Sequence, residues 1–371
     1  MIYRSYGNTG ERVSALGFGC MRLPEVERDG VFSVDQDKTD EMLRRAVELG
    51  VNYFDTAYYY CHENSEIAVG KALAPVRDRV LISTKCPVDE VKKPGDYRAF
   101  CEKSLQKLGT DHIDFYHFWA INKVEFDHMC ELRLLEEAEK LKAEGLIRHI
   151  SFSFHDHPKY IQYILERAPQ MESMLVQYNL LDRRNAKMID YAASRGLGVA
   201  AMGPVAGGRL AAPATLRQSV TGQEATAAYE LALRYVLANP GISIALSGME
   251  TLEMVERNAA VAAQARKLTT AEQKEVVRTR VMCKKFSELY CTGCKYCQPC
   301  PRGIEIPRLF QAYTYQNVYG AGELARAEWE GYAAGHRFAE CADCGLCEEK
   351  CPQKLKIREL LPKAEALFAQ A

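Results

Sequence analysis

One short stretch shows how this chain is built: residues 35–57 are DQDKTDEMLRRAVELGVNYFDTA. Apolar side chains recur at helical spacing between Met42 and Val47, and this pattern stops at Gly50. We expect a helix that is capped by Ser33 and ends before the glycine. The following residues, 52–57, have the length and composition of a buried strand. The stretch therefore predicts one helix that leads into one strand.

The same alternation continues over about the first 260 residues. Eight strands are expected, at 15–21, 52–57, 80–85, 113–119, 147–152, 174–178, 198–202 and 242–246. Eight strand–helix units can close into a parallel barrel or open into a doubly wound sheet. The open nucleotide-binding sheet has a G-x-G-x-x-G turn after its first strand, and residues 17–22, GFGCMR, lack the third glycine. We therefore expect an α/β fold, an eight-stranded (β/α)8 TIM barrel, with a hairpin over 3–14 closing its floor.

Composition and charge exclude several other classes of protein. Lys and Arg number 48 against 49 Asp and Glu, which gives a net charge of −1. No field of one sign is available for phosphate backbones or anionic lipid, so nucleic acid is not an expected partner. The N-terminus lacks a basic flank followed by an apolar run, and no stretch has about 18 consecutive apolar residues. We expect a cytoplasmic protein without a membrane anchor.

Cysteines divide the chain into regions. The sequence has 14 cysteines, and eight of them lie between Cys291 and Cys351. Clustered cysteines in a cytosolic chain hold metal more often than disulfides, because the cytosol keeps thiols reduced. We expect a barrel over 1–264, a helical connector over 265–290 and a small metal-binding domain over 291–371.

The two cysteine runs have the spacing of iron–sulfur ligands. They are CTGCKYCQPCP at 291–301 and CADCGLCEEKCP at 341–352. Two-residue spacing lets three thiolates surround one four-iron cube, and in two-cluster ferredoxins the fourth cysteine binds the other cluster. We expect a ferredoxin-like domain with two [4Fe-4S] clusters, whose ligand sets are Cys291, Cys294, Cys297 and Cys351, and Cys341, Cys344, Cys347 and Cys300.

Two features bear on this iron–sulfur assignment. Structural zinc sites are the alternative, but zinc uses four thiolates in two C-x2-C pairs and needs neither the third close cysteine nor the prolines. The first run also departs from the usual ferredoxin pattern, because two residues instead of three separate Cys297 from Cys300.

Polar residues gather where the second, third and fourth strands end. Asp55, Tyr60, Lys85 and His117 lie there, and active sites of such barrels form at the carboxyl ends of the strands. A tyrosine hydroxyl can protonate a substrate oxygen while hydride reaches the carbon, if a nearby ammonium lowers its pKa from about 10. Lys85 would supply that charge and Asp55 would hold it. Alternatively, Asp55 and Lys85 are only a buried ion pair, and Tyr60 is one ring of an aromatic run.

These residues belong to an ordered series of motifs that resembles the aldo/keto reductase family. The series covers nearly the whole chain, and the cysteine runs resemble those of an iron–sulfur branch of that family. The resemblance implies a barrel that binds an extended nicotinamide dinucleotide, with Asp55, Tyr60 and Lys85 as three of four catalytic residues. The motifs are NYFDTAY at 52–58, SE at 65–66, VG at 69–70, STK at 83–85, IDFY at 113–116 and VQYN at 176–179.

The resemblance also implies cofactor contacts. Ser153 and Gln177 would face the nicotinamide, and Glu256 and Asn258 the adenine. The turns that contain Gly207, Gly208 and Arg209, and Ser247 and Gly248, resemble phosphate-binding turns. Each residue can instead serve ordinary loop chemistry.

Two positions depart from the family pattern. Trp119 stands where the family carries its catalytic histidine, and His117 lies two residues earlier and roughly 7 Å deeper along the strand. His117 is then either a packed core residue or a relocated catalytic group, and His155 and His157 are alternative proton donors. Glu250 stands where NADPH-preferring members often carry a basic residue, which favours NAD(H) over NADP(H).

Two functions follow as hypotheses. The first is an oxidoreductase that reduces a small carbonyl or enone-like substrate with electrons from nicotinamide, from the clusters or from both. A redox partner protein at the ferredoxin-like domain would fit this activity. The second is an electron-transfer or partner-docking protein whose barrel has lost ordinary carbonyl reduction, since Trp119 replaces the histidine.

Overall fold

The computed structural model describes residues 1–28, 31–206, 228–283, 289, 291, 293, 295–319, 322–351 and 353–368. The described chain separates into two compact units. One consists of Met1–Pro204 and Leu233–Lys267, and the other of the described parts of Val205–Ala232 and Leu268–Ala371.

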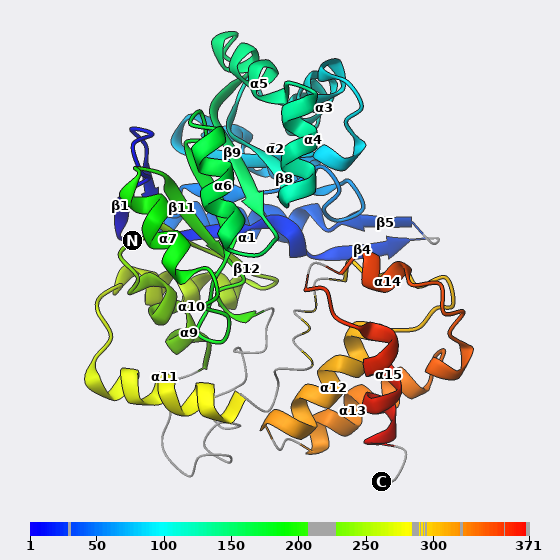
Figure 1. The fold of residues 1–371 in the computed structure, drawn as a ribbon. Coiled ribbons are helices and arrows are strands. Elements are labelled where there is room, and N and C mark those ends of the chain that lie inside the picture. The colour runs from blue at the N-terminus through cyan, green and yellow to red at the C-terminus, as the bar shows by residue number, and fades with distance from the viewer. Residues whose placement is uncertain are drawn as a thin grey trace. The chain divides into compact units, whose positions relative to one another are not determined.

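The first unit is a closed barrel of eight strands (Figure 1). Neighbouring strands pair in parallel all the way around. The predicted barrel is therefore confirmed. Its strands are β3 (Leu16–Gly19), β6 (Tyr53–Asp55), β7 (Leu81–Pro87), β8 (Ile113–Ile121), β9 (Ile147–Phe154), β10 (Ser173–Gln177), β11 (Gly198–Met202) and β12 (Ile244–Gly248).

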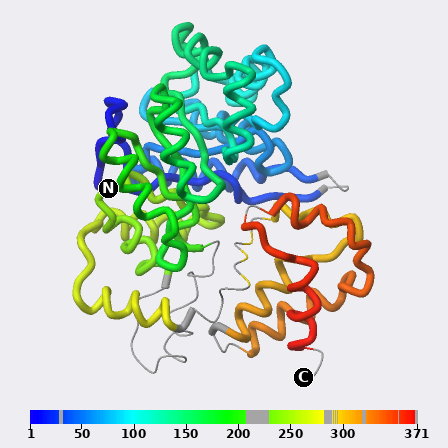
Figure 2. Tube along the Cα trace, viewed as in Figure 1, coloured from blue at the N-terminus to red at the C-terminus, as the bar shows by residue number. Residues whose placement is uncertain are grey.

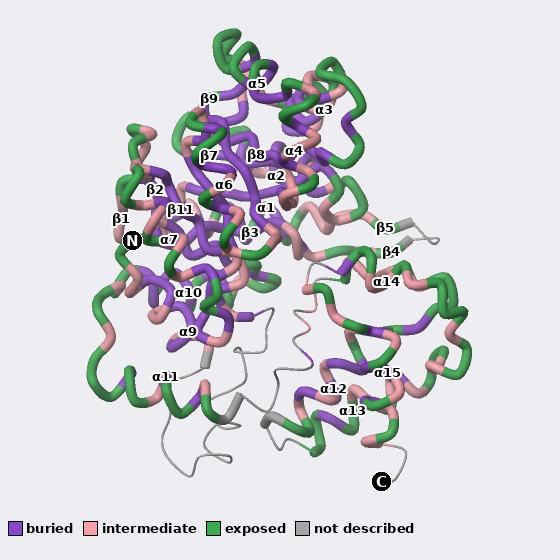
Figure 3. Tube along the Cα trace, viewed as in Figure 1, coloured by how far each residue is buried: buried purple, intermediate pink, exposed green. Residues whose placement is uncertain are grey.

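Helices connect these strands and cover the barrel, whose strands are almost entirely buried (Figure 3). They are α1 (Gln36–Glu48), α2 (Ser65–Leu73), α3 (Pro94–Leu108), α4 (Lys123–Glu131), α5 (Leu134–Ala143), α6 (Lys159–Arg167), α7 (Ala186–Ser194), α9 (Ala228–Leu237) and α10 (Leu252–Ala263).

Helices α4 and α5 follow each other closely in the chain. Arg133 adopts a left-handed backbone conformation, with φ +56°, and so separates α4 from α5. Both strand β7 and strand β8 extend two residues beyond their predicted ends. The longer strands carry the segment around Trp119 as part of the sheet.

The N-terminal cap of α1 differs from the predicted one. Asp35, not Ser33, caps α1, because its side chain accepts a hydrogen bond from the Lys38 amide at 3.2 Å. Ser33 instead lies in β5 (Val31–Val34), which pairs with β4 (Glu25–Arg28) in a hairpin that was not predicted.

The barrel floor is closed as expected. Strands β1 (Tyr3–Ser5) and β2 (Arg12–Ser14) pair in an antiparallel hairpin. Tyr6 between them is fully buried, and its ring packs edge-on against Phe115 inside the barrel, with 5.0 Å between ring centroids. The site therefore has to form at the other end of the strands.

The second unit is helical. Its helices are α11 (Thr270–Cys283), α12 (Ile306–Tyr319), α13 (Gly322–Ala333), the 3-10 helix η6 (Phe338–Glu340), α14 (Leu346–Glu349) and α15 (Ile357–Ala366). Helices α12 and α13 lie side by side, and α15 packs on α12 (Figure 2). A small core that includes Leu309, Phe310 and Leu361 lies between them. Within the described residues of the chain, no helix is both long and apolar enough to span a membrane.

Candidate active site and metal centre

A buried ion pair lies at the carboxyl end of the barrel. Asp55 ends β6 and pairs in register with Ser83 on β7, so Lys85 follows two residues later on the same face. The Lys85 Nζ donates to Asp55 Oδ2 at 2.6 Å and to the Thr56 carbonyl oxygen at 2.5 Å. Ser83 Oγ donates to the other carboxylate oxygen at 2.7 Å. The exposed fractions of Asp55 and Lys85 are only 2% and 1%.

Burial and charge act in opposite directions on this pair. Burial raises the pKa of Asp55, and the Lys85 ammonium opposes that change. Burial likewise lowers the pKa of Lys85, and the Asp55 carboxylate opposes it. Each charge is therefore tolerable only while the other is present. The site therefore holds an ammonium in a fixed place, shielded from water, with the Asp55 carboxylate as its counter-charge.

Tyr60 lies over this charge. The Lys85 Nζ is 4.7 Å from the centroid of the Tyr60 ring, and the ring itself is half-buried. An ammonium at this distance interacts favourably with the face of an aromatic ring. Folding therefore brings together Asp55, Lys85 and Tyr60, as expected from their places at the ends of neighbouring strands.

Trp119 completes an aromatic cluster, which we define as Tyr59, Tyr60 and Trp119. The indole meets the Tyr60 ring edge-on, with centroids 5.7 Å apart and an interplanar angle of 89°. Tyr59 lies on it at 6.0 Å, and the Tyr59 hydroxyl donates to Glu90 Oε2 at 2.7 Å. Trp119 is in register with Pro87, two residues beyond the register pair of Lys85 and His117. The indole thus occupies the end of its strand, next to the phenol.

His117 lies inside the barrel, in the layer of Lys85. It is fully buried, its Nδ1 lies 2.8 Å from Ser151 Oγ, and its Nε2 lies 3.8 Å from Asp55 Oδ1. Burial and the Lys85 charge hold the pKa of His117 well below its usual range, so the imidazole is neutral. His155 is half-buried directly after β9, and His157 is exposed.

Two predicted nicotinamide contacts are buried polar groups at strand ends. Ser153 is buried, and its Oγ accepts a hydrogen bond from the Ala120 amide at 2.8 Å, which leaves its hydroxyl proton available. Gln177 ends β10, and its buried side-chain nitrogen has no hydrogen-bond partner among the described residues. A buried donor without a partner is costly, and a carboxamide group of a bound cofactor would satisfy it.

Two of the remaining predicted cofactor contacts bind each other, and two others bind arginine side chains. Asn258 Nδ2 donates to Ser247 Oγ at 3.2 Å, next to Gly248 at the end of β12. Glu250 and Glu256 instead have basic partners: Arg22 Nη1 lies 3.6 Å from Glu250, and Arg45 Nε donates to Glu256 at 2.9 Å. Gly207, Gly208 and Arg209 lie outside the described residues.

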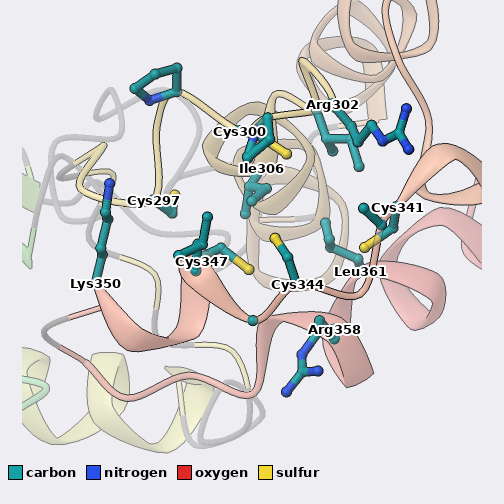
Figure 4. Close-up of a pocket in the computed structure, with 16 residues that line it drawn as sticks. Cys297, Cys300, Arg302, Ile306, Cys341, Cys344, Cys347, Lys350, Arg358 and Leu361 are labelled. Atoms are coloured by element: carbon teal, nitrogen blue, oxygen red, sulfur yellow. The ribbon is translucent and has the colours of Figure 1, made fainter.

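Five cysteines line one pocket in the second unit (Figure 4). Four of them form one predicted ligand set, Cys300 from the first run with Cys341, Cys344 and Cys347 from the second. The fifth is Cys297. Among the described residues, no three metal-ligating side chains lie close enough together to hold an ion.

The other predicted ligand set is described in part. Cys291 and Cys351 border the same small core as the pocket, and Cys351 is 7% exposed. Cys294 lies outside the described residues. Backbone amides approach the sulfurs as well, since the Asp343 and Gly293 amides each donate to the cysteine two residues earlier at 3.4 Å. The donor set of the pocket is sulfur alone, with no carboxylate or histidine in its lining, which fits an iron–sulfur cluster.

Sequence patterns missed several partners of these groups. Ser83 lies two residues before Lys85 on one strand face, so period-2 alternation was enough to find it. Arg22 beside Glu250, Ser151 beside His117 and Glu90 beside Tyr59 come from distant segments, and no local pattern marks them.

Comparison with known proteins gives the same two-part architecture. The model of the aldo/keto reductase family matches residues 15–279, and that of a 4Fe-4S dicluster domain matches residues 290–356. L-galactose dehydrogenase of Arabidopsis thaliana is 31% identical over 284 residues, 69% of this chain and 86% of that protein. The uncharacterized oxidoreductase YqkF of Bacillus subtilis is 29% identical over 306 residues, 74% of this chain and 95% of that protein.

A solved structure has the same barrel fold. The holo form of aldo-keto reductase AKR11C1 from Bacillus halodurans superimposes with a TM-score of 0.63 at 29% identity, covering 75% of this chain and 96% of that one. The predicted resemblance is thus confirmed in both parts. This chain belongs to the aldo/keto reductase family and carries a C-terminal 4Fe-4S dicluster domain.

Proposed function

We propose that this oxidoreductase uses NAD(H) in its barrel to reduce a small carbonyl or conjugated, enone-like substrate. Two [4Fe-4S] clusters, held by residues 291–371, would deliver electrons to this chemistry or remove them. The observation that carries the proposal is the buried Asp55–Lys85 pair beneath the Tyr60 ring, because it fixes an ammonium beside a phenol at the carboxyl end of a barrel.

Each residue of the site has a distinct role in this proposal. Tyr60 donates its hydroxyl proton to the substrate oxygen, and the Lys85 ammonium stabilises the phenolate that remains. Asp55 holds the ammonium in place through the 2.6 Å hydrogen bond. His117 is a positioning residue, since it packs against this pair and stays neutral. Bound NADH would supply the hydride.

Trp119 determines which substrates react well. An indole offers one N–H donor and transfers no proton near neutral pH, so it cannot polarise a carbonyl as the histidine of the family does. Its broad face, next to Tyr59 and Tyr60, suits a flat conjugated substrate that stacks on aromatic rings. We therefore expect poor reduction of plain aldehydes and ketones and better reduction of enones or quinones.

The cofactor contacts remain those that the family resemblance implies. Ser153 and Gln177 would bind the nicotinamide carboxamide, as their buried polar groups allow. Ser247 and Gly248 would bind phosphate together with Gly207, Gly208 and Arg209. Asn258 and Glu256 would face the adenine, and the Glu250 carboxylate would repel the additional phosphate of NADPH.

The test is an anaerobic panel of aldehydes, ketones, enones and quinones with NADH. Wild type is compared with Tyr60→Phe, Trp119→His and, as a matched control, Tyr59→Phe, which removes a neighbouring hydroxyl. Tyr60→Phe should abolish enone reduction, Trp119→His should raise plain carbonyl reduction, and Tyr59→Phe should keep most of the activity. Wild-type reduction of plain aldehydes at about 10 s⁻¹, an ordinary enzyme rate, would contradict the proposed role of Trp119.

One observation favours a second candidate function. The imidazole of His117 is fully buried, and the strand end carries Trp119 instead. A barrel that has lost reductase chemistry would leave an electron-transfer or partner-docking protein. In that case no substrate of the panel would turn over, and Tyr60→Phe would not change electron transfer by the clusters.

A further inference from the structure

We propose that Lys107 is a positioning residue, which holds the turn that carries Tyr60 in place over Lys85. We call residues 58–63, which come after β6, the tyrosine turn. The inference deepens the proposed function and rests on it in one respect, namely that Tyr60 is the proton donor. It assigns a role in the reaction to a side chain of the outer helical layer, which no substrate touches.

The tyrosine turn has an unfavourable backbone conformation. Its last three residues, Cys61, His62 and Glu63, are all left-handed, with φ of +51°, +52° and +67°. Residues with a Cβ rarely adopt this conformation, because each one costs conformational free energy. The Asn64 side chain donates to the carbonyl oxygens of Cys61 and His62 at 3.3 and 2.9 Å, but Asn64 directly follows the turn and supports it only locally. The turn therefore needs to be held by other parts of the fold.

Lys107, near the end of α3, supplies that support. Its Nζ donates to the Tyr58 carbonyl oxygen at 3.2 Å and lies 3.5 Å from the centroid of the Tyr58 ring. The same ammonium donates to Glu63 Oε2 at 3.4 Å. A cation over the face of a tyrosine ring adds to the attraction. One charged group therefore contacts both the first and the last residue of the tyrosine turn.

A buried carboxylate fixes the position of this ammonium. Glu66 on α2 is fully buried, and its Oε2 lies 3.7 Å from the Lys107 Nζ. Its Oε1 accepts a hydrogen bond at 2.6 Å from Thr84 Oγ1, and Thr84 precedes Lys85 on β7. Burial raises the pKa of Glu66, and the Thr84 hydroxyl and the Lys107 charge oppose that change. Side-chain contacts thus connect the strand of Lys85 to the turn of Tyr60.

Other contacts of the turn are made by exposed side chains. Tyr59 binds Glu90, and the His62 ring stacks on Phe32 with 4.9 Å between centroids. All four of these side chains are exposed, whereas the Lys107 side chain is only 17% exposed. Contacts between exposed side chains contribute less, because ordering both side chains costs conformational entropy. Lys107 therefore makes the contact whose loss should release the turn.

The test uses Trp119 as a reporter in the full-length holoprotein, because its indole meets the Tyr60 ring edge-on. The sequence has two tryptophans, so Trp329→Phe leaves Trp119 as the only one. Displacement of the turn uncovers the indole, which should increase the quenching of its fluorescence by acrylamide. Turnover of an enone with NADH is measured on the same samples.

Three variants in this background separate positioning from charge neutralisation. Lys107→Met removes the ammonium, and the addition of Glu66→Gln also removes the buried charge that would be left without its partner. Lys103→Met changes an exposed lysine of the same helix and is the matched control. We expect Lys107→Met and the double variant to increase quenching and to lower turnover at least about tenfold, because small displacements of reacting groups are costly. The control should match the background in both measurements.

Three results would overturn the proposal. The first is quenching and turnover in the double variant at the level of the background, because Lys107 would then only neutralise Glu66. The second is unchanged quenching in Lys107→Met. The third is increased quenching with unchanged turnover, because the position of the turn would then not matter to the reaction.

Two further measurements make these outcomes unambiguous. Denaturant unfolding and the cluster absorbance establish that each variant is folded and carries its clusters. The quenching measurement requires neither nicotinamide nor substrate. A failure of the proposed reductase activity is therefore distinguishable from a failure of Lys107 to hold the turn.

Discussion

The two halves of the molecule build their sites in opposite ways. In the barrel, the charged groups find their partners within the protein: Lys85 binds Asp55 and Thr56, and Asp55 also accepts from Ser83. In the second unit, five described cysteines border one pocket, whose lining contains no carboxylate or histidine. The comparison teaches that the protein supplies both members of the ion pair in the barrel, whereas the thiols of the second unit are ligands for a group from outside the chain.

The cores of the two units explain this difference. The eight strands of the barrel are almost entirely buried, whereas the second unit packs a few helices around a small apolar core that the cysteines themselves border. Small domains need a staple such as a structural metal, because their cores bury too little apolar surface. Bound metal contributes folding free energy directly.

Removal of the metal should produce the largest difference between the two units. Chelation of iron under anaerobic, reducing conditions should abolish amide protection in α12 and α15 and leave it unchanged in β7 and β8, as measured by hydrogen exchange. Cys344→Ala should give part of the same loss, and Cys130→Ala, an exposed cysteine in α4, should give none. Slow exchange in α12 and α15 without iron would show that the second unit folds without a cluster.

The next largest effect concerns the buried pair. Lys85→Met leaves the Asp55 carboxylate buried without its counter-charge, which should cost about 3–5 kcal/mol of stability and about 10² or more in turnover. The double variant Lys85→Met with Asp55→Asn should recover most of the stability but none of the turnover, and the cluster absorbance should remain. Restored turnover in the double variant would show that the pair is structural only.

A smaller effect is expected at Glu250. Glu250→Arg should shift the preference from NADH toward NADPH by about tenfold, measured by calorimetry with both nucleotides. The change is modest because the carboxylate is 54% exposed and its field is screened. Glu253→Arg on α10 is the control, because it reverses an exposed charge that is paired with Arg257. A wild-type preference for NADPH would refute the role of Glu250.

The smallest effect is a pH dependence of barrel stability. His117 has a lowered pKa in the folded state, so the unfolded chain takes up a proton first as pH falls below about 6.5. The stability that neutral His117 contributes is thus complete above pH 6.5 and is lost below it, by about 1 kcal/mol at pH 5.5. Hydrogen exchange of β8 in wild type and in His117→Gln at pH 7.5 and 5.5 measures this difference. An equal pH response in both proteins would contradict it.

Periodicity was sufficient for the architecture. Eight apolar runs predicted eight strands, and the structure shifts their ends by no more than two residues. The lack of a third glycine after Gly17 and Gly19 correctly excluded the doubly wound sheet. The ends of strands that neighbour each other in the barrel also predicted that Asp55, Lys85 and Tyr60 would meet, because parallel strands end at one edge.

Local sequence patterns did not predict the contacts between residues that lie far apart in the chain. Asp35 caps α1 while Ser33 lies in the β4–β5 hairpin. The basic partners of Glu250 and Glu256 are Arg22 and Arg45, which lie far away in the chain. The depth of His117 relative to Trp119 followed from alternation, but its bond to Ser151 did not. Tertiary contacts of this kind have no signature in a window of ten or twenty residues.

The most direct test of the central claim is an anaerobic titration of the oxidised holoprotein with NADH, followed by the visible absorbance of the clusters. The account predicts that NADH bleaches this absorbance reversibly, that NADPH does so less effectively, and that dithionite sets the full amplitude. If dithionite bleaches the clusters and NADH binds without bleaching them, the nicotinamide and the clusters do not exchange electrons, and the account is wrong.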